Sequence, residues 1–131
     1  MNDMTDFNNS NLNGWAPLHT MVPIHIGRSG SEYYIFTTHN AYMGCHKTFA
    51  NAGPGVYEVT VRYRHSPRTS GNYVYLNAVS IKYFTAEAGA NWSSTTQGPL
   101  ISTTDKAQFA IRFENSQVQI SSIQVKQISR S

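Results

Sequence analysis

The clearest alternation of apolar and polar side chains lies between Gly55 and His65. The odd-numbered positions carry apolar or aromatic side chains, namely Tyr57, Val59, Val61 and Tyr63. The even-numbered positions between them carry polar side chains, namely Glu58, Thr60, Arg62 and Arg64. Successive side chains of a strand point to opposite faces, so this stretch predicts a strand with one buried and one solvated side. Turn-forming runs flank it at 51–55 and 66–72, and its length favours a central position in an antiparallel sheet.

Shorter stretches predict further strands at residues 20–26, 32–38, 45–50, 73–84, 107–113 and 118–128. Pro23 cannot donate a ladder hydrogen bond, so the first of these is expected at a sheet edge. The parity slips near Asn77-Ala78 and at Ser121-Ser122, and each slip predicts a bulge or a bend between sheets. Residues 85–100 are polar and are expected to form a long connection.

No stretch of ten residues has the apolar spacing of a helix. About eight short strands separated by turns therefore predict an all-β fold, an antiparallel β-sandwich or barrel. Residues 1–131 are expected to form a single domain, since a chain of this length can bury a core and no repeat or boundary interrupts it. Residues 1–18 are rich in turn-forming Asn and predict an extended lead-in, and residues 129–131 predict a frayed tail.

The composition is unusually poor in charge. Charged residues make up 13% of the chain, against roughly 25% in an average globular domain. The polar surface must then consist largely of Asn, Ser, Thr and Gln, which is common in secreted β proteins and in binders of neutral ligands such as sugars. The net charge is +3, and Arg62, Arg64 and Arg68 are the nearest approach to a basic patch. Nucleic-acid binding normally needs a clustered basic footprint, so no nucleic acid partner is expected.

Cys45 is the only cysteine, so the chain has no internal disulfide and its stability must come from packing. No apolar run reaches 18 residues, so no membrane span is expected. The segment from Met1 to Asp6 lacks the basic and apolar regions of a signal peptide. The expected location is extracellular or the surface of a virion, reached after a leader is removed or without one, as in virion proteins released by lysis.

One segment resembles a known family. Asp6-Phe7-Asn8-Asn9-Ser10-Asn11-Leu12-Asn13-Gly14-Trp15 is similar to the opening of galactose-binding-like jelly-roll modules, which are often carbohydrate-binding and often begin with Asp-Phe-Glu, a short linker and Leu-x-Gly-Trp. The GxYxVxxxYR pattern from Gly55 to Arg64 is also similar to these modules. The resemblance implies a jelly-roll β-sandwich over most of the chain, with Phe7 and Trp15 as structural residues.

The resemblance also bears on metal binding. A structural calcium ion is frequent in the resembled family near both chain ends, and Asp6 is the acid that would match one of its ligands. The closing strand of the family often carries an acidic pair, whereas this chain has Ser121-Ser122-Ile123-Gln124-Val125. We therefore expect no cofactor, with a structural calcium as the alternative.

Trp92 is the leading candidate for ligand contact. It lies beside Asn91 and a run of Ser and Thr in the polar 85–100 segment. An exposed indole stacks on the C–H face of a sugar ring, while Asn and Ser hydrogen-bond to sugar hydroxyls. Tyr42, in the loop of residues 39–44, is a second loop-borne candidate. The alternative for Trp92 is that it folds back and closes the edge of the sandwich.

A sheet face is the other candidate. If Tyr73 and Tyr75 face outward beside Arg62 and Arg64, they form an aromatic and basic face that suits a glycan, including an acidic one. Ordinary cross-strand packing of Tyr on Arg is the alternative. In the strand predicted at 32–38 both parities carry bulky side chains, which indicates either cover on both sides or a groove.

Catalytic and metal motifs are missing from the sequence. His39, Cys45 and His46 match no zinc spacing, and no base is placed by motif to activate the Cys45 thiol. The seven carboxylates have no motif context as an acid–base pair for glycoside hydrolysis. We therefore expect neither a metal site nor an enzyme.

The sequence favours a non-catalytic, lectin-like carbohydrate-binding module whose partner is a glycan or a cell-surface polysaccharide. A single site of this kind binds weakly, so a homo-oligomer is expected to supply avidity. The first alternative is a structural virion protein, such as a phage capsid-decoration or tail-accessory domain with a virion partner. A small lectin or toxin-associated binding protein of a bacterium is a further alternative.

Overall fold

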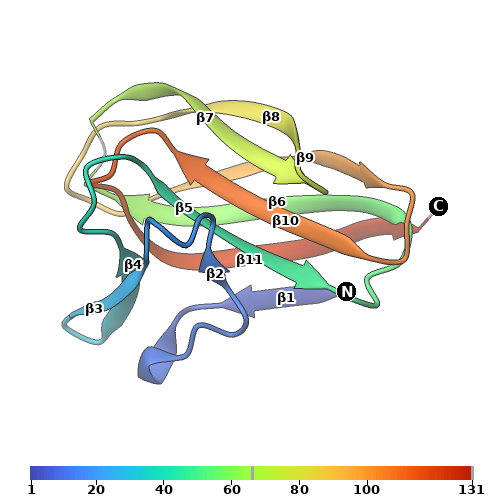
Figure 1. Cartoon of the computed structure of the whole chain (residues 1–131), viewed down its shortest axis with the longest axis horizontal. Helices are drawn as coiled ribbons and strands as arrows, with labels where there is room; N and C mark the ends of the chain where they lie inside the picture. Colours follow the sequence, from blue (N-terminus) through green and yellow to red (C-terminus); the bar gives the residue numbers. More distant parts are fainter. Residues whose placement is uncertain (66, 131) are drawn as a thin grey trace.

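The computed structural model describes residues 1–65 and 67–130, apart from the side chains of Ser80 and Ile81. The described residues form eleven strands and one short 3₁₀ segment, in the order β1 (Asn2–Thr5), η1 (Asn8–Ser10), β2 (Ala16–Pro17), β3 (His25–Ser29), β4 (Glu32–Phe36), β5 (Met43–Phe49), β6 (Gly55–Arg64), β7 (Thr69–Leu76), β8 (Val79–Ala86), β9 (Ser93–Ser102), β10 (Ala107–Phe113) and β11 (Gln119–Arg130). Figure 1 shows the long strands running between the two ends of the molecule.

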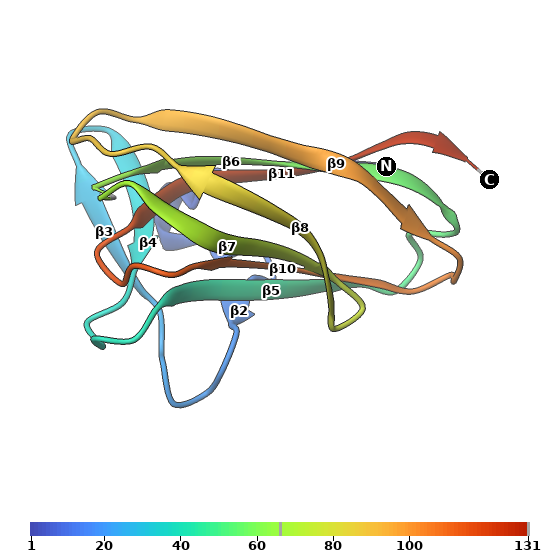
Figure 2. The ribbon, with the colours of Figure 1, turned by 90° about the horizontal axis from the view of Figure 1, so that it is seen from above.

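The strands form two antiparallel sheets packed face to face. The six-stranded sheet has the order β3-β4-β11-β6-β9, with β1 also paired to β11, and the five-stranded sheet has the order β2-β5-β10-β7-β8. Figure 2 shows β6, β9 and β11 in one layer and β2, β5 and β10 in the other. The prediction of an all-β antiparallel sandwich is therefore confirmed, with more strands than the eight expected.

The predicted central strand is β6, which pairs with β11 on one side and with β9 on the other. Tyr57 and Tyr63 point into the core and are 0% and 2% exposed. Their rings meet those of Phe109 and Phe113 on β10, with centroids 5.3 Å and 5.0 Å apart. These aromatic contacts join the two sheets, and they leave Arg62 and Arg64 on the outer face of the six-stranded sheet.

The bulge predicted at Ser121-Ser122 is present in β11. The pairing register with β6 shifts between Ile120 and Ser122, so that Ile120, Ile123 and Val125 are all fully buried. The bulge thus keeps the apolar side chains of β11 in the core on both sides of the slip.

The single bent strand predicted at 73–84 is wrong, because the parity slip there is a hairpin turn. Asn77 and Ala78 have φ angles of 52° and 67° and join β7 to β8. Two consecutive residues with positive φ are the hallmark of a tight two-residue hairpin turn. The backbone N–H of Asn77 donates to the carbonyl of Gln108 at 2.9 Å, and this contact ties the turn to β10.

The long connection predicted at 85–100 is also wrong, because its second half is β9, a strand at the edge of the six-stranded sheet. This segment has no apolar alternation, because β9 is an edge strand that pairs with β6 among the described residues and most of its residues are half-buried or exposed. Hydroxyl pairing replaces apolar packing on its outer face, where Oγ1 of Thr96 and Oγ1 of Thr60 lie 2.9 Å apart.

Two further boundaries differ from expectation. The strand predicted at 20–26 begins later, after Pro23, and is β3 at His25–Ser29. It pairs with β4 along its whole length, including Gly27 with Tyr34. The tail predicted to fray continues in β11, where Ser129 pairs with Val56, while residue 131 lies outside the described residues. In both places the neighbouring strand decides the conformation, because ladder pairing overrides local turn preference.

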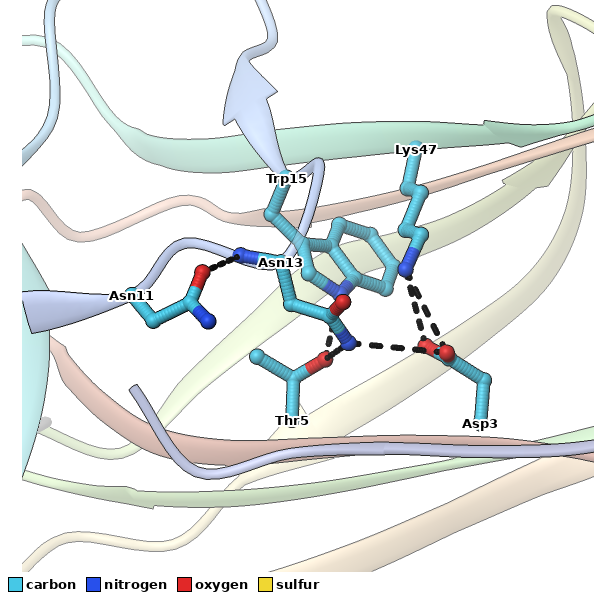
Figure 3. Close-up of polar contacts among 6 residues, drawn as sticks. All are labelled: Asp3, Thr5, Asn11, Asn13, Trp15 and Lys47. Carbon is cyan, nitrogen blue, oxygen red and sulfur yellow. Dashed lines mark hydrogen bonds and ion pairs between the residues drawn. The ribbon is translucent and has the colours of Figure 1, made fainter. Parts of the chain in front are cut away.

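The N-terminal lead-in is attached to the sandwich by a polar network (Figure 3). Trp15 is 1% exposed, and its indole Nε1 donates to Oγ1 of Thr5 at 3.2 Å. The amide of Asn13 donates to the same oxygen at 2.8 Å. Beside them, Nζ of Lys47 lies 3.2 Å from Oδ2 of Asp3. Trp15 is therefore structural, as the resemblance implied, and Phe7 is likewise buried at 1% exposure.

Candidate functional site

Trp92 lies on the outer face of the six-stranded sheet, at the end where β6 finishes and β9 begins. Ser93, the first residue of β9, pairs with Tyr63 of β6, and this register brings Trp92 beside Arg64. The alternation of β6 places Arg62 and Arg64 on the same outer face. The structure therefore brings together Trp92, Arg62 and Arg64, three of the predicted site residues.

The ζ-carbon of Arg64 lies 4.3 Å from the centroid of the Trp92 ring and 5.3 Å from that of Tyr34. The ζ-carbon of Arg62 lies 4.9 Å from the Trp92 ring. The rings of Tyr34 and Trp92 have centroids 6.3 Å apart, although β11 and β6 lie between their strands. We call this group, with Glu32, the Trp92 face. It is a compact cluster of two aromatic rings and two guanidinium groups.

The side chains of the Trp92 face are held by neighbours. The Tyr34 ring lies directly over Gly27, since a Cβ added to that glycine would meet ring atoms at 2.6 Å. Nε of Arg64 donates to Oε1 of Gln119 at 2.8 Å. Arg62 forms an ion pair with Glu32. A binding surface whose rotamers are fixed in advance loses less entropy when a ligand binds.

The aromatic surface continues beyond Tyr34 toward β3. Phe36 lies two residues further along β4, and its ring centroid is 5.9 Å from that of Tyr34. The ring centroid of His25, on β3, lies 5.6 Å from that of Phe36. The rings of Tyr34, Phe36 and Trp92 are all half-buried, so each keeps exposed surface. Asn91, the predicted hydrogen-bonding neighbour of Trp92, is exposed.

A polar pocket of about 440 Å³ adjoins the Trp92 face. Its charged side chains are Glu32, Arg62 and Asp6, and its hydroxyl-bearing residues are Ser31, Tyr33 and the two serines of the β11 bulge. Arg62 and Glu32 belong to both the pocket and the face, so a ligand on the aromatic rings can extend polar groups into the pocket.

Tyr73 and Tyr75 do not join this site. They lie on β7 of the five-stranded sheet, whereas Arg62 and Arg64 lie on β6 of the other sheet, so the single face predicted from all four is wrong. The chain crosses from one sheet to the other between β6 and β7. Consecutive strands are therefore not neighbours here, and their outer faces point in opposite directions.

Tyr73 and Tyr75 instead share the opposite outer face with Tyr42. Arg112 of β10 takes the basic position there, with its ζ-carbon 4.6 Å from the Tyr42 ring and 6.0 Å from the Tyr73 ring. Nε of Arg112 is buried and has no hydrogen-bond partner among the described residues. A hollow of about 360 Å³ lies beside Tyr75, over Ala110.

The sequence pointed to Trp92 but missed Tyr34, Phe36 and Glu32. The signal for them was that bulky side chains occupy both the odd and the even positions of residues 32–38, which indicated a strand covered on both sides or a groove. The structure places Ile35 in the core at 0% exposure and leaves Tyr34 and Phe36 on the outer face. Which distant side chains these rings meet depends on the sheet order, which a single strand pattern does not contain.

The described residues offer little for metal or nucleophilic chemistry. No group of three or more His, Cys, Asp and Glu side chains among them is placed to hold a metal ion. Asp6, the acid implied for calcium, accepts a hydrogen bond from the backbone N–H of Asn8 at 3.0 Å. Burial raises the pKa of the Cys45 thiol, which disfavours the nucleophilic thiolate.

Among the same residues, no helix has the length and apolar character needed to cross a membrane.

No protein-family model matches this chain, and no curated protein matches it. Solved structures match it over nearly its whole length. The CBM22-1 xylan-binding domain of Xyn10C from Paenibacillus barcinonensis has a TM-score of 0.73 at 10% identity, covering 98% of this chain and 95% of that one. The C-terminal CBM6 of the laminarinase LamC from Zobellia galactanivorans has a TM-score of 0.66 at 11% identity, covering 97% of this chain and 100% of that one.

A third match is the GH26-CBM35 β-(1,4)-mannanase from Podospora anserina, with a TM-score of 0.64 at 16% identity. It covers 99% of this chain, and this chain spans only 28% of that enzyme. Identities this low establish the fold and not the ligand. The chain has the galactose-binding-like jelly-roll β-sandwich fold of these carbohydrate-binding modules.

Proposed function

We propose that this chain is a non-catalytic carbohydrate-binding module and that it binds its glycan on the Trp92 face. The observation that carries the proposal is the meeting of Trp92 with Tyr34, at 6.3 Å between ring centroids, beside Arg62 and Arg64. The fold shared with carbohydrate-binding modules supports the ligand class. The partner is then an extracellular glycan or polysaccharide.

The chemistry of the face suits a sugar ring. The exposed parts of the Trp92 and Tyr34 rings offer apolar surface to the C–H groups of a pyranose, and the guanidinium groups offer N–H donors to its hydroxyls. Glu32 accepts from hydroxyl donors. The polar pocket beside Arg62 gives room for a neighbouring sugar unit. The one carboxylate of the Trp92 face, Glu32, forms an ion pair with Arg62, and we therefore propose that it binds and does not act as an acid or base in hydrolysis.

The predicted tyrosines outside the Trp92 face are not part of the proposed binding site. Tyr42, Tyr73 and Tyr75 lie on the opposite face, so their removal is expected to leave glycan binding on the Trp92 face unchanged. Nothing in the comparisons supports the alternative of a structural virion protein. A homo-oligomer remains our proposal for avidity, since one shallow site binds weakly.

The test is affinity electrophoresis of the whole chain in gels that contain xylan, β-1,4-mannan, laminarin or the anionic polysaccharide polygalacturonate. We expect at least one polysaccharide to retard the wild-type protein. Trp92→Ala is expected to lose at least roughly thirtyfold in affinity, as about 2 kcal/mol of an interface hot spot implies.

Tyr75→Ala is the matched control, because it removes an aromatic ring from the opposite sheet. Retardation of Trp92→Ala with loss in Tyr75→Ala would move the site to the five-stranded sheet. No retardation in any gel, repeated with the protein displayed multivalently on beads, would overturn the carbohydrate-binding proposal.

A further inference from the structure

We propose that the Trp92 face selects anionic sugar units and that Arg64 holds the anionic group, a carboxylate or a sulfate ester. This inference rests on the proposed function and names the ligand class of the same site. It starts from the different surroundings of Arg62 and Arg64, which lie two residues apart on one strand face and have separate partners.

Arg64 is held in place by its neighbours, and only one of its three guanidinium nitrogens has a hydrogen-bond partner among the described residues. Its guanidinium lies over both the Trp92 and the Tyr34 rings, at 4.3 Å and 5.3 Å from their centroids. Its Nε is occupied by Oε1 of Gln119 at 2.8 Å. Among the described residues its two terminal nitrogens have no hydrogen-bond partner. The rings lie against the guanidinium, and the N–H donors of its terminal nitrogens are the ones that a ligand would use.

The charges around Arg64 are unbalanced. Arg62 is neutralised by its ion pair with Glu32. No carboxylate forms an ion pair with Arg64 within the described part of the chain. The side chains facing it from β4, β11 and the residue before β9 are Tyr34, Gln119 and Trp92, none of them acidic. The Trp92 face therefore carries one uncompensated positive charge at a fixed place.

A guanidinium in this setting favours an anion over a hydroxyl. Carboxylate and sulfate oxygens accept two parallel N–H bonds from the edge of an arginine, and such charge-assisted bonds are roughly twice as strong as neutral ones. The half-buried rings of Tyr34 and Trp92 replace part of the water around the guanidinium, which lowers the local dielectric constant and strengthens the attraction. A neutral sugar hydroxyl gains from neither effect to the same degree.

The test uses the fluorescence of the whole chain during titration with glucose, glucuronic acid or glucose 6-sulfate. We expect at least one of the two anionic sugars to bind at least tenfold more tightly than glucose, and the better of the two identifies the anionic group. Raising the salt concentration should reduce this preference, because screening weakens partly exposed charge pairs. Equal binding of glucose and both anionic sugars would overturn the inference.

Variants assign the effect to Arg64. Arg64→Gln should bring the anionic sugars down to the affinity of glucose, and Arg64→Lys should keep part of the preference, since it keeps the charge without the fork. Glu32→Gln should increase the preference, because it frees the charge of Arg62. Arg68→Gln is the control: Arg68 lies 70% exposed in the loop after β6 and should change nothing.

The outcomes separate this inference from the proposed function. If Trp92→Ala abolishes polysaccharide retardation while the wild type shows no preference for anions, the module binds glycans and the inference fails. If Arg64→Gln weakens glucose and anionic sugars by the same factor, Arg64 has only a packing role and the inference fails. Absence of all polysaccharide binding overturns both.

Discussion

The indole Nε1 of Trp15 donates a hydrogen bond to Oγ1 of Thr5 across 3.2 Å, and both side chains are almost fully buried, at 1% and 2% exposure. The amide of Asn13 donates to the same hydroxyl oxygen at 2.8 Å. Thr5 belongs to β1, which pairs with β11, whereas Trp15 immediately precedes β2 of the other sheet. This one hydroxyl therefore ties the lead-in to both layers of the sandwich.

Thr5→Val should destabilise the fold by about 1–3 kcal/mol, because the buried indole N–H loses its acceptor while the shape of the side chain is kept. Urea unfolding followed by tryptophan fluorescence measures the change. Thr5→Ser keeps the hydroxyl and should lose less than Thr5→Val. Equal stability of Thr5→Val and wild type would mean that Trp15 finds another acceptor.

Ala78→Gly should stabilise the protein by about 0.5–1 kcal/mol, because Ala78 has a φ of 67° at the turn between β7 and β8. Glycine adopts this left-handed conformation without the clash of a Cβ, and Asn-Gly is the preferred pair of such a turn. Thermal unfolding measures the gain. Ala88→Gly, in a loop without positive φ at that residue, should give no gain. A loss of stability in Ala78→Gly would contradict the turn geometry.

This turn also shows why the fold was only partly predictable. β6 and β10 were recognised because each has a buried and an exposed parity, which comes from their position inside a sheet. The parity slip at Asn77-Ala78 was visible, but a bulge and a two-residue turn produce the same slip. The strand β9 was missed because an edge strand that exchanges hydroxyl contacts has no apolar alternation to detect.

The candidate site was partly predictable for a related reason. Trp92 stood out because an aromatic residue within a polar segment has few places to be buried. Tyr34 was not linked to it, since the contact depends on β4 and β9 lying in one sheet. The sequence pattern groups Tyr73 with Arg62 because strands that are neighbours in sequence are often neighbours in space, and this grouping is wrong because the chain changes sheet after β6.

Stability should fall above pH 10, in part through Tyr57. Burial raises the pKa of Tyr57 above its usual value of 10.0, an effect that the nearby charge of Arg130 partly offsets. Its hydroxyl donates to the carbonyl oxygens of Ala52 and Gly53, at 2.7 Å and 2.6 Å. The unfolded chain loses this proton at lower pH than the folded chain, so the stabilisation is complete below pH 10 and is lost as pH rises through the folded pKa.

Urea unfolding of wild type and Tyr57→Phe at pH 8, 10 and 11 checks this prediction. Tyr57→Phe should be less stable at pH 8, where it lacks the hydrogen bonds, by about 0.5–1.5 kcal/mol. The difference should shrink toward pH 11, because only the wild type has this tyrosine to ionise. A difference that stays constant with pH would show that Tyr57 contributes nothing to the alkaline loss.

Gly27→Ala should weaken glycan binding without unfolding the protein. An added Cβ would meet atoms of the Tyr34 ring at 2.6 Å, so the ring must move, while the backbone of Gly27 has no positive φ that an alanine would strain. Moving Tyr34 separates it from Trp92 and removes one of the two rings over Arg64.

We expect roughly a tenfold loss of affinity, which corresponds to about 1.4 kcal/mol, for the polysaccharide that retards the wild type. Far-UV circular dichroism and the thermal midpoint should stay close to those of the wild type. Gly30→Ala, whose Cβ would meet no atom within 4 Å, controls for loss of a glycine in the same hairpin: its φ of 62° should cost the alanine some stability, but glycan binding should stay normal. Normal binding by Gly27→Ala would mean that Tyr34 takes no part in the site and that Trp92 acts with the arginines alone.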